Sequence, residues 1–182
     1  RTLAIVAGHV ITLSDVRTAI VLRLIDVPAG QDRVEAGAER LVERALMLRE
    51  VERYLPAEPP MAEVDARVED IRARFETPLD FARALEAGGF TTARLRAWLR
   101  DDLRIAEYLA QRFATGGVPT DQEIGAYYAA HREEFERSGV PFEEIVPLVR
   151  ERLTGERRRE LIADWVDGLR RRTDVVELYR QN

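Results

Sequence analysis

The residues that could do chemistry in this sequence are two histidines, several paired carboxylates and two short arginine runs. His9 and His131 are far apart in the sequence, and there is no cysteine for thiolate chemistry, disulfides or sulfur-bound metals. The adjacent acids Asp101–Asp102 and Glu133–Glu134 would point to different sides of a helix, so neither pair could share a proton. We therefore expect no catalytic residue, no metal site and no cofactor.

The arginine runs are the basic segments Arg157–Arg159 and Arg170–Arg172. Glu156 and Glu160 flank the first run and Asp167 precedes the second, a pattern typical of a solvated helix face with ion pairs along it. Contact with nucleic acid is the alternative, and the net charge of −5 disfavours it. All basic residues are arginine, which indicates a compositional bias rather than a chemical role.

The elements that would position these residues are mostly helices. Apolar residues at intervals of three and four predict a series of helices. Short β-branched runs predict a hairpin over residues 3–12 that turns at Gly8–His9, and a strand over residues 174–179. The expected fold class is all-α with a small β element, an elongated multi-helix body whose N-terminal hairpin pairs with the C-terminal strand. The helices are expected from Ser14–Asp15 as N-cap, over 33–54, 61–75, from Thr77 to Gly88, from 91 or 92 to 114, over 120–135 and over 142–172.

Residues 118–153 contain a joint between two helical bodies. Thr120 stands three residues before Glu123, which predicts a capping box at the start of a helix. Only Glu136–Val140 separates Phe135 from the restart at Pro141. We expect three regions: 1–135, a short link at 136–140, and a long helix with a strand at 141–182 that packs back on the first region.

The order of these elements resembles the SurA-like family of bacterial periplasmic chaperones, which includes parvulin-type prolyl isomerases. The resemblance extends over nearly the whole chain. The matching segments are IVAGHVITLSDV at 5–16, Leu41–Met47, Val118–Ile124 with Tyr127–Tyr128 and Glu134–Phe135, Pro141–Ile145, and Asp174–Leu178.

This resemblance implies an ATP-independent chaperone that binds unfolded or outer-membrane-bound polypeptides in the periplasm or cell envelope. Relatives carry their isomerase domain at the joint, where this chain has the five residues 136–140, so the resemblance implies binding without catalysis. A prolyl isomerase and a dimeric structural module, made by exchanging terminal strands, are the alternatives. Because the sequence starts at Arg1, we expect a signal peptide or anchor to have been removed.

A chaperone of this kind must offer apolar surface to its clients. Four apolar residues of the expected third and fourth helices and the turn after them are candidates for client binding. The alternative is that all four are ordinary core residues. The four candidates are Met61, Phe75, Phe81 and Phe90.

Overall fold

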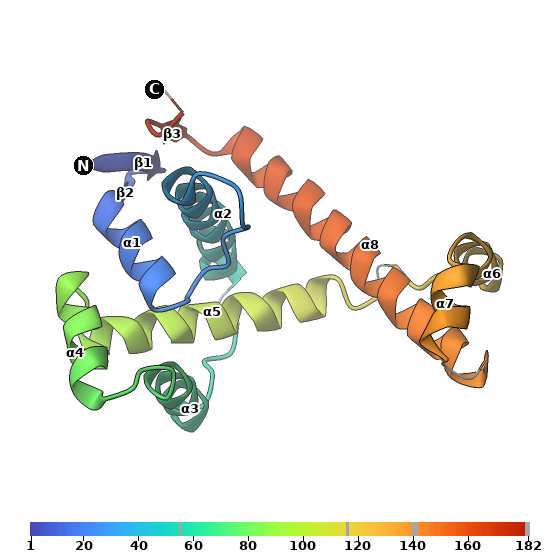
Figure 1. Ribbon diagram of the computed structural model, residues 1–182. Coiled ribbons are helices and arrows are strands. Elements are labelled where there is room, and N and C mark those ends of the chain that lie inside the picture. Colours follow the sequence, from blue (N-terminus) through green and yellow to red (C-terminus); the bar gives the residue numbers. More distant parts are fainter. Residues whose placement is uncertain (55, 116, 140–141, 181–182) are drawn as a thin grey trace. The chain divides into compact units, whose positions relative to one another are not determined.

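The computed structural model describes residues 1–54, 56–115, 117–139 and 142–180 (Figure 1). They form two compact units, one of residues 1–108 with the segment from Val166 onward, and one of residues 109–165. We call them unit 1 and unit 2. These units differ from the three predicted regions, because residues 109–135 group with the beginning of the last helix.

The described chain is mainly helical with one small sheet, as predicted. Long apolar repeats between proline and glycine stops set most of the helix ends. The elements in order are β1 (Thr2–Val6), β2 (His9–Thr12), α1 (Leu13–Val21), α2 (Arg33–Tyr54), α3 (Met61–Arg72), α4 (Pro78–Ala87), α5 (Thr92–Arg112), α6 (Asp121–Ala130), α7 (Arg132–Ser138), α8 (Phe142–Arg172) and β3 (Val175–Glu177).

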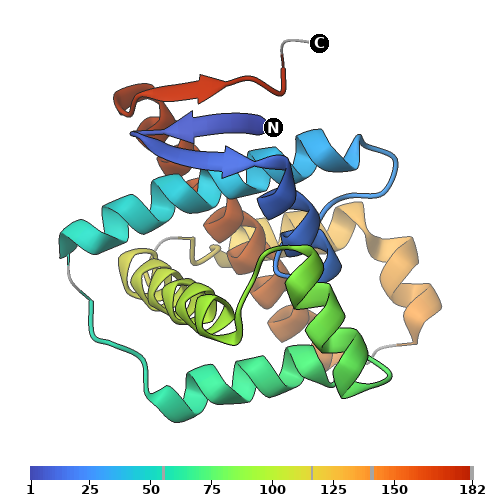
Figure 2. The same cartoon turned by 90° about the vertical axis from the view of Figure 1, so that its left-hand side faces the viewer.

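The sheet has the strand order β2-β1-β3, and both pairings are antiparallel. The predicted pairing of the hairpin with the C-terminal strand is therefore confirmed, and Figure 2 shows β1 and β3 side by side. The predicted turn position was wrong by one residue. The turn residues are Ala7 and Gly8, both with positive φ (47° and 87°), as a type I′ hairpin requires. His9 is instead the first residue of β2.

Helix α1 begins earlier than the sequence predicted. Its N-cap is Thr12, whose side chain accepts a hydrogen bond from the backbone N–H of Asp15. The Asp15 carboxylate accepts in return from the backbone N–H of Thr12 at 2.9 Å, which completes a capping box. The expected cap at Ser14–Asp15 was wrong because the strand runs into the helix with no loop between them.

Unit 1 is held together where glycines let helices approach closely. The position of a Cβ on Gly37 would lie 2.7 Å from Val16 Cγ1, so α2 packs tightly on α1. At the end of α4, a Cβ on Gly88 would lie 1.8 Å from Thr18 Oγ1. A core cluster then joins the end of α1 to α3, α4 and α5. Its buried members are Leu22, Val64, Val68, Ile71, Phe81, Leu85, Phe90, Leu95 and Leu99.

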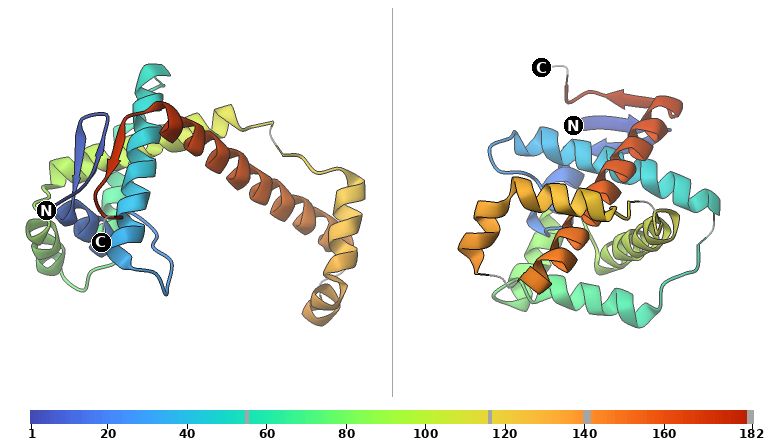
Figure 3. Two further views of the ribbon diagram at one scale, coloured as in Figure 1. Left: turned by 90° about the horizontal axis from the view of Figure 1, so that it is seen from above. Right: turned by 90° about the vertical axis from the view of Figure 1, so that its right-hand side faces the viewer.

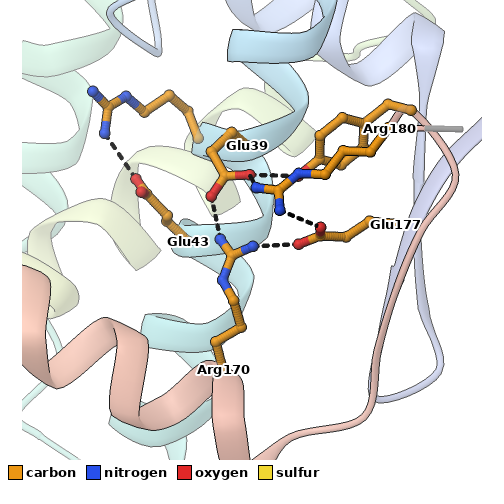
Figure 4. A network of polar contacts seen from close by, with 7 residues as sticks. Glu39, Glu43, Arg170, Glu177 and Arg180 are labelled. Carbon is orange, nitrogen blue, oxygen red and sulfur yellow. Dashed lines mark hydrogen bonds and ion pairs between the residues drawn. The ribbon is translucent and has the colours of Figure 1, made fainter. Parts of the chain in front are cut away.

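Within unit 1, a network of charges around Glu39 connects α2 to the C-terminal segment (Figure 4). Its carboxylate accepts hydrogen bonds from Arg170, the Tyr179 hydroxyl and, at 2.9 Å, Arg180. Glu177 of β3 pairs with the same two arginines. Burial raises the pKa of Glu39, but Tyr179 and the arginines outweigh it, so the pKa stays below its ordinary value.

Unit 2 consists of α6, α7 and the adjoining parts of α5 and α8 (Figure 3). The predicted capping box at Thr120 and Glu123 is confirmed. Hydrogen bonds from the Thr120 backbone and side chain, and then from Arg157, lower the pKa of Glu123 to about 2. The buried core of the unit is Ile124, Phe135, Ile145 and Val149.

The single helix predicted over 120–135 is two helices. They meet at His131, whose φ of −115° and ψ of 20° leave the helical region. The His131 ring stacks on Tyr127 at 4.0 Å between centroids. Of the predicted link 136–140, residues Glu136 to Ser138 continue α7, and Gly139 caps it in a left-handed conformation. The remaining positions, Val140 and the expected restart at Pro141, lie outside the described residues.

Candidate functional site

A groove of about 590 Å³ lies in unit 1 between the hairpin, α2 and α5. This volume is within the usual range for ligand sites in proteins. Figure 2 shows that β2 is the strand of the sheet nearest to α5. The lining residues are Val6–Ala7, His9–Ile11 and Asp15 from the hairpin side, Leu41, Arg44, Ala45, Leu48, Arg49 and Glu52 from α2, and Arg94, Ala97, Trp98 and Asp101 from α5.

Apolar side chains from two helices line the groove between its charged residues. Leu41 is buried, and Ala45, Leu48 and Trp98 are half-buried. The Trp98 ring lies against Phe90 of the core, with 5.9 Å between ring centroids. Ala45 and Ala97 are small, so neither can fill the space between α2 and α5. The groove thus offers apolar contact area that is anchored directly on the core of the unit.

Arginine–carboxylate pairs hold two of the charged side chains of the groove in place. The Arg44 guanidinium lies over the Trp98 ring, with 3.8 Å between its Cζ and the ring centroid. Its Nε lies 2.7 Å from Oδ1 of Asp102. At the hairpin side, Arg94 contacts Asp15 at 2.8 Å. Arg44 is therefore part of the aromatic wall, and Arg94 lies beside the capping box of α1.

The pKa values of the two carboxylates, Asp15 and Asp102, are shifted in opposite directions. Burial raises the pKa of Asp15, but hydrogen bonds from Thr12 and the charge of Arg94 outweigh it, so the pKa is lowered. For Asp102, burial dominates and the pKa is raised, although Arg44 and Trp98 partly offset it. Asp102 does not line the groove, so its effect there is to position Arg44.

The charges on the groove wall are balanced. Three arginines (Arg44, Arg49 and Arg94) stand against three acids (Asp15, Glu52 and Asp101). A groove for a nucleotide or another strongly charged ligand would carry an excess of the opposite charge. This lining instead suits an uncharged and partly apolar occupant.

The candidate client-binding residues lie elsewhere in unit 1. Phe81 and Phe90 are only 7% and 4% exposed, because they pack in the core cluster. Phe75 is half-buried with its ring 5.6 Å from that of Phe81. Met61, at the start of α3, is 68% exposed. None of the four lines the groove, and the burial of Phe81 and Phe90 leaves little of either side chain for a client to contact.

Sequence reasoning missed the groove residues for a physical reason. Trp98 is on the apolar face of its helix, which predicts only burial. Its contact with Arg44 depends on α2 and α5 lying side by side, and no spacing within either helix encodes that. The one available signal was an arginine among the apolar residues of α2, close to the small Ala45.

Other kinds of site are not found in the part of the chain that the structure describes. No group of three or more His, Asp or Glu side chains there could hold a metal ion. None of the described helices is long and apolar enough to cross a membrane.

No family model matches the sequence, and none of the curated proteins has significant sequence similarity to it.

Proposed function

We propose that this chain is an ATP-independent chaperone of the SurA-like kind, which holds unfolded polypeptide segments of the cell envelope in the groove of unit 1. The observation that carries the proposal is the groove itself, with its apolar side chains and balanced charge. The order of hairpin, helices and C-terminal strand, on which the resemblance rests, supports it.

The chemistry of the lining fits weak and general binding. One apolar side chain that moves from water into such a groove gains about 1.5–3 kcal/mol, and part of this is offset by the ordering of the client chain. The resulting affinity allows a client to leave without any covalent step or nucleotide. Ion-paired arginines around the apolar side chains keep that surface from collapsing on itself.

The proposal predicts that a charge placed inside the groove will abolish most of the client binding. Ala97 is exposed and lines the groove, so Ala97→Glu adds a carboxylate there with little effect on the core. An apolar client would have to strip water from that carboxylate. We expect about tenfold weaker binding of a fluorescein-labelled peptide of alternating leucine and threonine, equivalent to ~1.4 kcal/mol. Fluorescence anisotropy measures it.

The same variants test the activity on a whole protein. Wild-type chain at equimolar amounts is expected to suppress the aggregation of chemically denatured citrate synthase, and Ala97→Glu to lose most of that effect. Ala82→Glu is the matched control, because Ala82 is exposed on α4 and does not line the groove. The proposal fails if the wild-type chain neither binds the peptide nor slows aggregation. Acceleration of proline-limited refolding would favour an isomerase instead.

A further inference from the structure

The open edge of β2 runs along the groove, and the hydrogen bonds of the sheet show which backbone groups it presents. The N–H of Ala7 donates to the carbonyl of Asp174, and the N–H of Leu178 to the carbonyl of Leu3, both at 2.8 Å. Both N and O of a residue in an antiparallel strand point to the same side, and the sides alternate along the strand. Leu3 and Ile5 of β1, and Ala7 in the turn after it, therefore direct their backbone groups toward β3.

This alternation determines the direction in which the backbone N–H and C=O of Val10 point. Val10 is the partner of Ile5 in the pairing of β2 with β1. Because Ile5 bonds toward β3, Val10 is in a non-hydrogen-bonded pair, and its N–H and C=O point away from β1. No described strand lies beyond β2, and Val10 is one of the groove-lining residues. The groove is thus bordered by a backbone donor and acceptor that the sheet does not use.

The open edge is short because the capping box closes its other end. Thr12 is the next residue of β2 with an outward-facing N–H, and that group already donates to the Asp15 carboxylate at 2.9 Å. Arg94 then holds Asp15 from the side of α5. Val10 is therefore the residue of this edge that a new strand can pair with.

We infer that the groove takes an extended polypeptide segment, which adds to the sheet as a short fourth strand bonded to the N–H and C=O of Val10. The balanced charge of the lining favours a neutral backbone over a charged ligand, and a strand alternates its side chains, so every second one would point toward Leu48 and Trp98. Main-chain bonds carry no sequence information, which suits a protein with many clients. The inference rests on the proposed function, since it assigns the manner in which the same groove holds its client.

Val10→Pro tests the inference, because proline has no N–H to donate and is tolerated on an edge strand. We expect this change to weaken binding of the leucine–threonine peptide by about tenfold, because the hydrogen bond that the Val10 N–H would donate is lost while the C=O remains. Val175→Pro is the matched control. Val175 lies one residue from Val176 of β3, which pairs with Ile5, so its N–H points to the far edge of the sheet, away from the groove. The affinity of Val175→Pro for the peptide should stay within about twofold of that of the wild type.

A second measurement uses the wild-type protein and so does not depend on the folding of any variant. Two versions of the same peptide, N-methylated at all leucines or at all threonines, should differ, because the N–H groups that face β2 belong to only one of these two sets. One version should bind weakly and the other normally. Equal loss in the two versions, or unchanged binding of Val10→Pro in a folded protein, would overturn strand addition while leaving capture by side chains intact. Failure of the wild-type chain to bind the unmodified peptide would overturn both.

Discussion

Replacing Gly88 with alanine is expected to lower the free energy of unfolding by about 2–3 kcal/mol. The backbone of Gly88 has a φ of −92° and a ψ of −2°, which any residue adopts, so the cost comes from space alone. The added Cβ would lie 1.8 Å from Oγ1 and 2.6 Å from Cβ of Thr18. Thr18 is only 2% exposed and its hydroxyl donates to the carbonyl of Ser14, so α1 must move away from α4. Urea denaturation followed by circular dichroism measures the loss.

Two further variants show whether the contact with Thr18 is responsible. Thr18→Ala removes the atoms nearest to the new methyl group. The double variant should therefore lose less unfolding free energy than the sum of the losses in the two single variants. Gly125→Ala is the control for a helical glycine with nothing within 4 Å of its Cβ position. It should raise stability by up to about 1 kcal/mol through helix propensity. A similar gain in Gly88→Ala would show that α1 and α4 are not in tight contact.

Glu39→Gln is expected to cost about 2 kcal/mol at neutral pH, because hydrogen bonds to a charged group are stronger than neutral ones. Two arginines and a tyrosine hydroxyl from the C-terminal segment converge on this carboxylate. Glu43→Gln on the same helix is the control. Glu43 forms an ion pair with Arg40, whose side chain is 48% exposed, and its loss should cost less than about 1 kcal/mol.

The contribution of Glu39 to the free energy of unfolding is expected to decrease as the pH falls. Its pKa is lowered in the folded state, so its contribution is fully present above the ordinary glutamate value of about 4.3 and is lost as the pH falls through the folded pKa. The difference in unfolding free energy between wild type and Glu39→Gln should therefore be largest near pH 7 and shrink toward pH 3. A constant difference across this range would contradict the charge-based explanation.

The sequence predicted the elements better than their contacts. The bounds of α2 and α8 agree with the prediction, because clear stops border both segments. The break at His131 was missed because the apolar repeat continues through it. What ends α6 is the local backbone at His131, together with a ring that stacks on Tyr127, and periodicity contains no information about either.

The groove was beyond sequence reasoning for a related reason. Its wall combines Arg44 of α2 with Trp98 of α5, and its edge is the backbone of Val10. Each residue alone predicts something ordinary, a solvated charge, a buried ring and a strand residue. Only the packing of hairpin and helices places them together. The residues chosen from the sequence were instead Met61, Phe75, Phe81 and Phe90. Phe81 and Phe90 are buried in the core because of the same apolar size that led to their choice.

The pairing of β1 with β3 joins segments from opposite ends of the described chain, and this has a consequence for the order of folding. During synthesis β1 emerges early, yet its partner strand and Arg170 and Arg180 emerge after α5, α6 and α7. Closing so long a loop is entropically unfavourable until other contacts have formed. Unit 2 is continuous in the sequence and can fold while it emerges, whereas unit 1 cannot be completed until β3 has been synthesised. Until then β1 has an unpaired edge, which makes the nascent chain prone to aggregation. The nascent chain is thus itself a polypeptide of the type that the folded protein is proposed to hold.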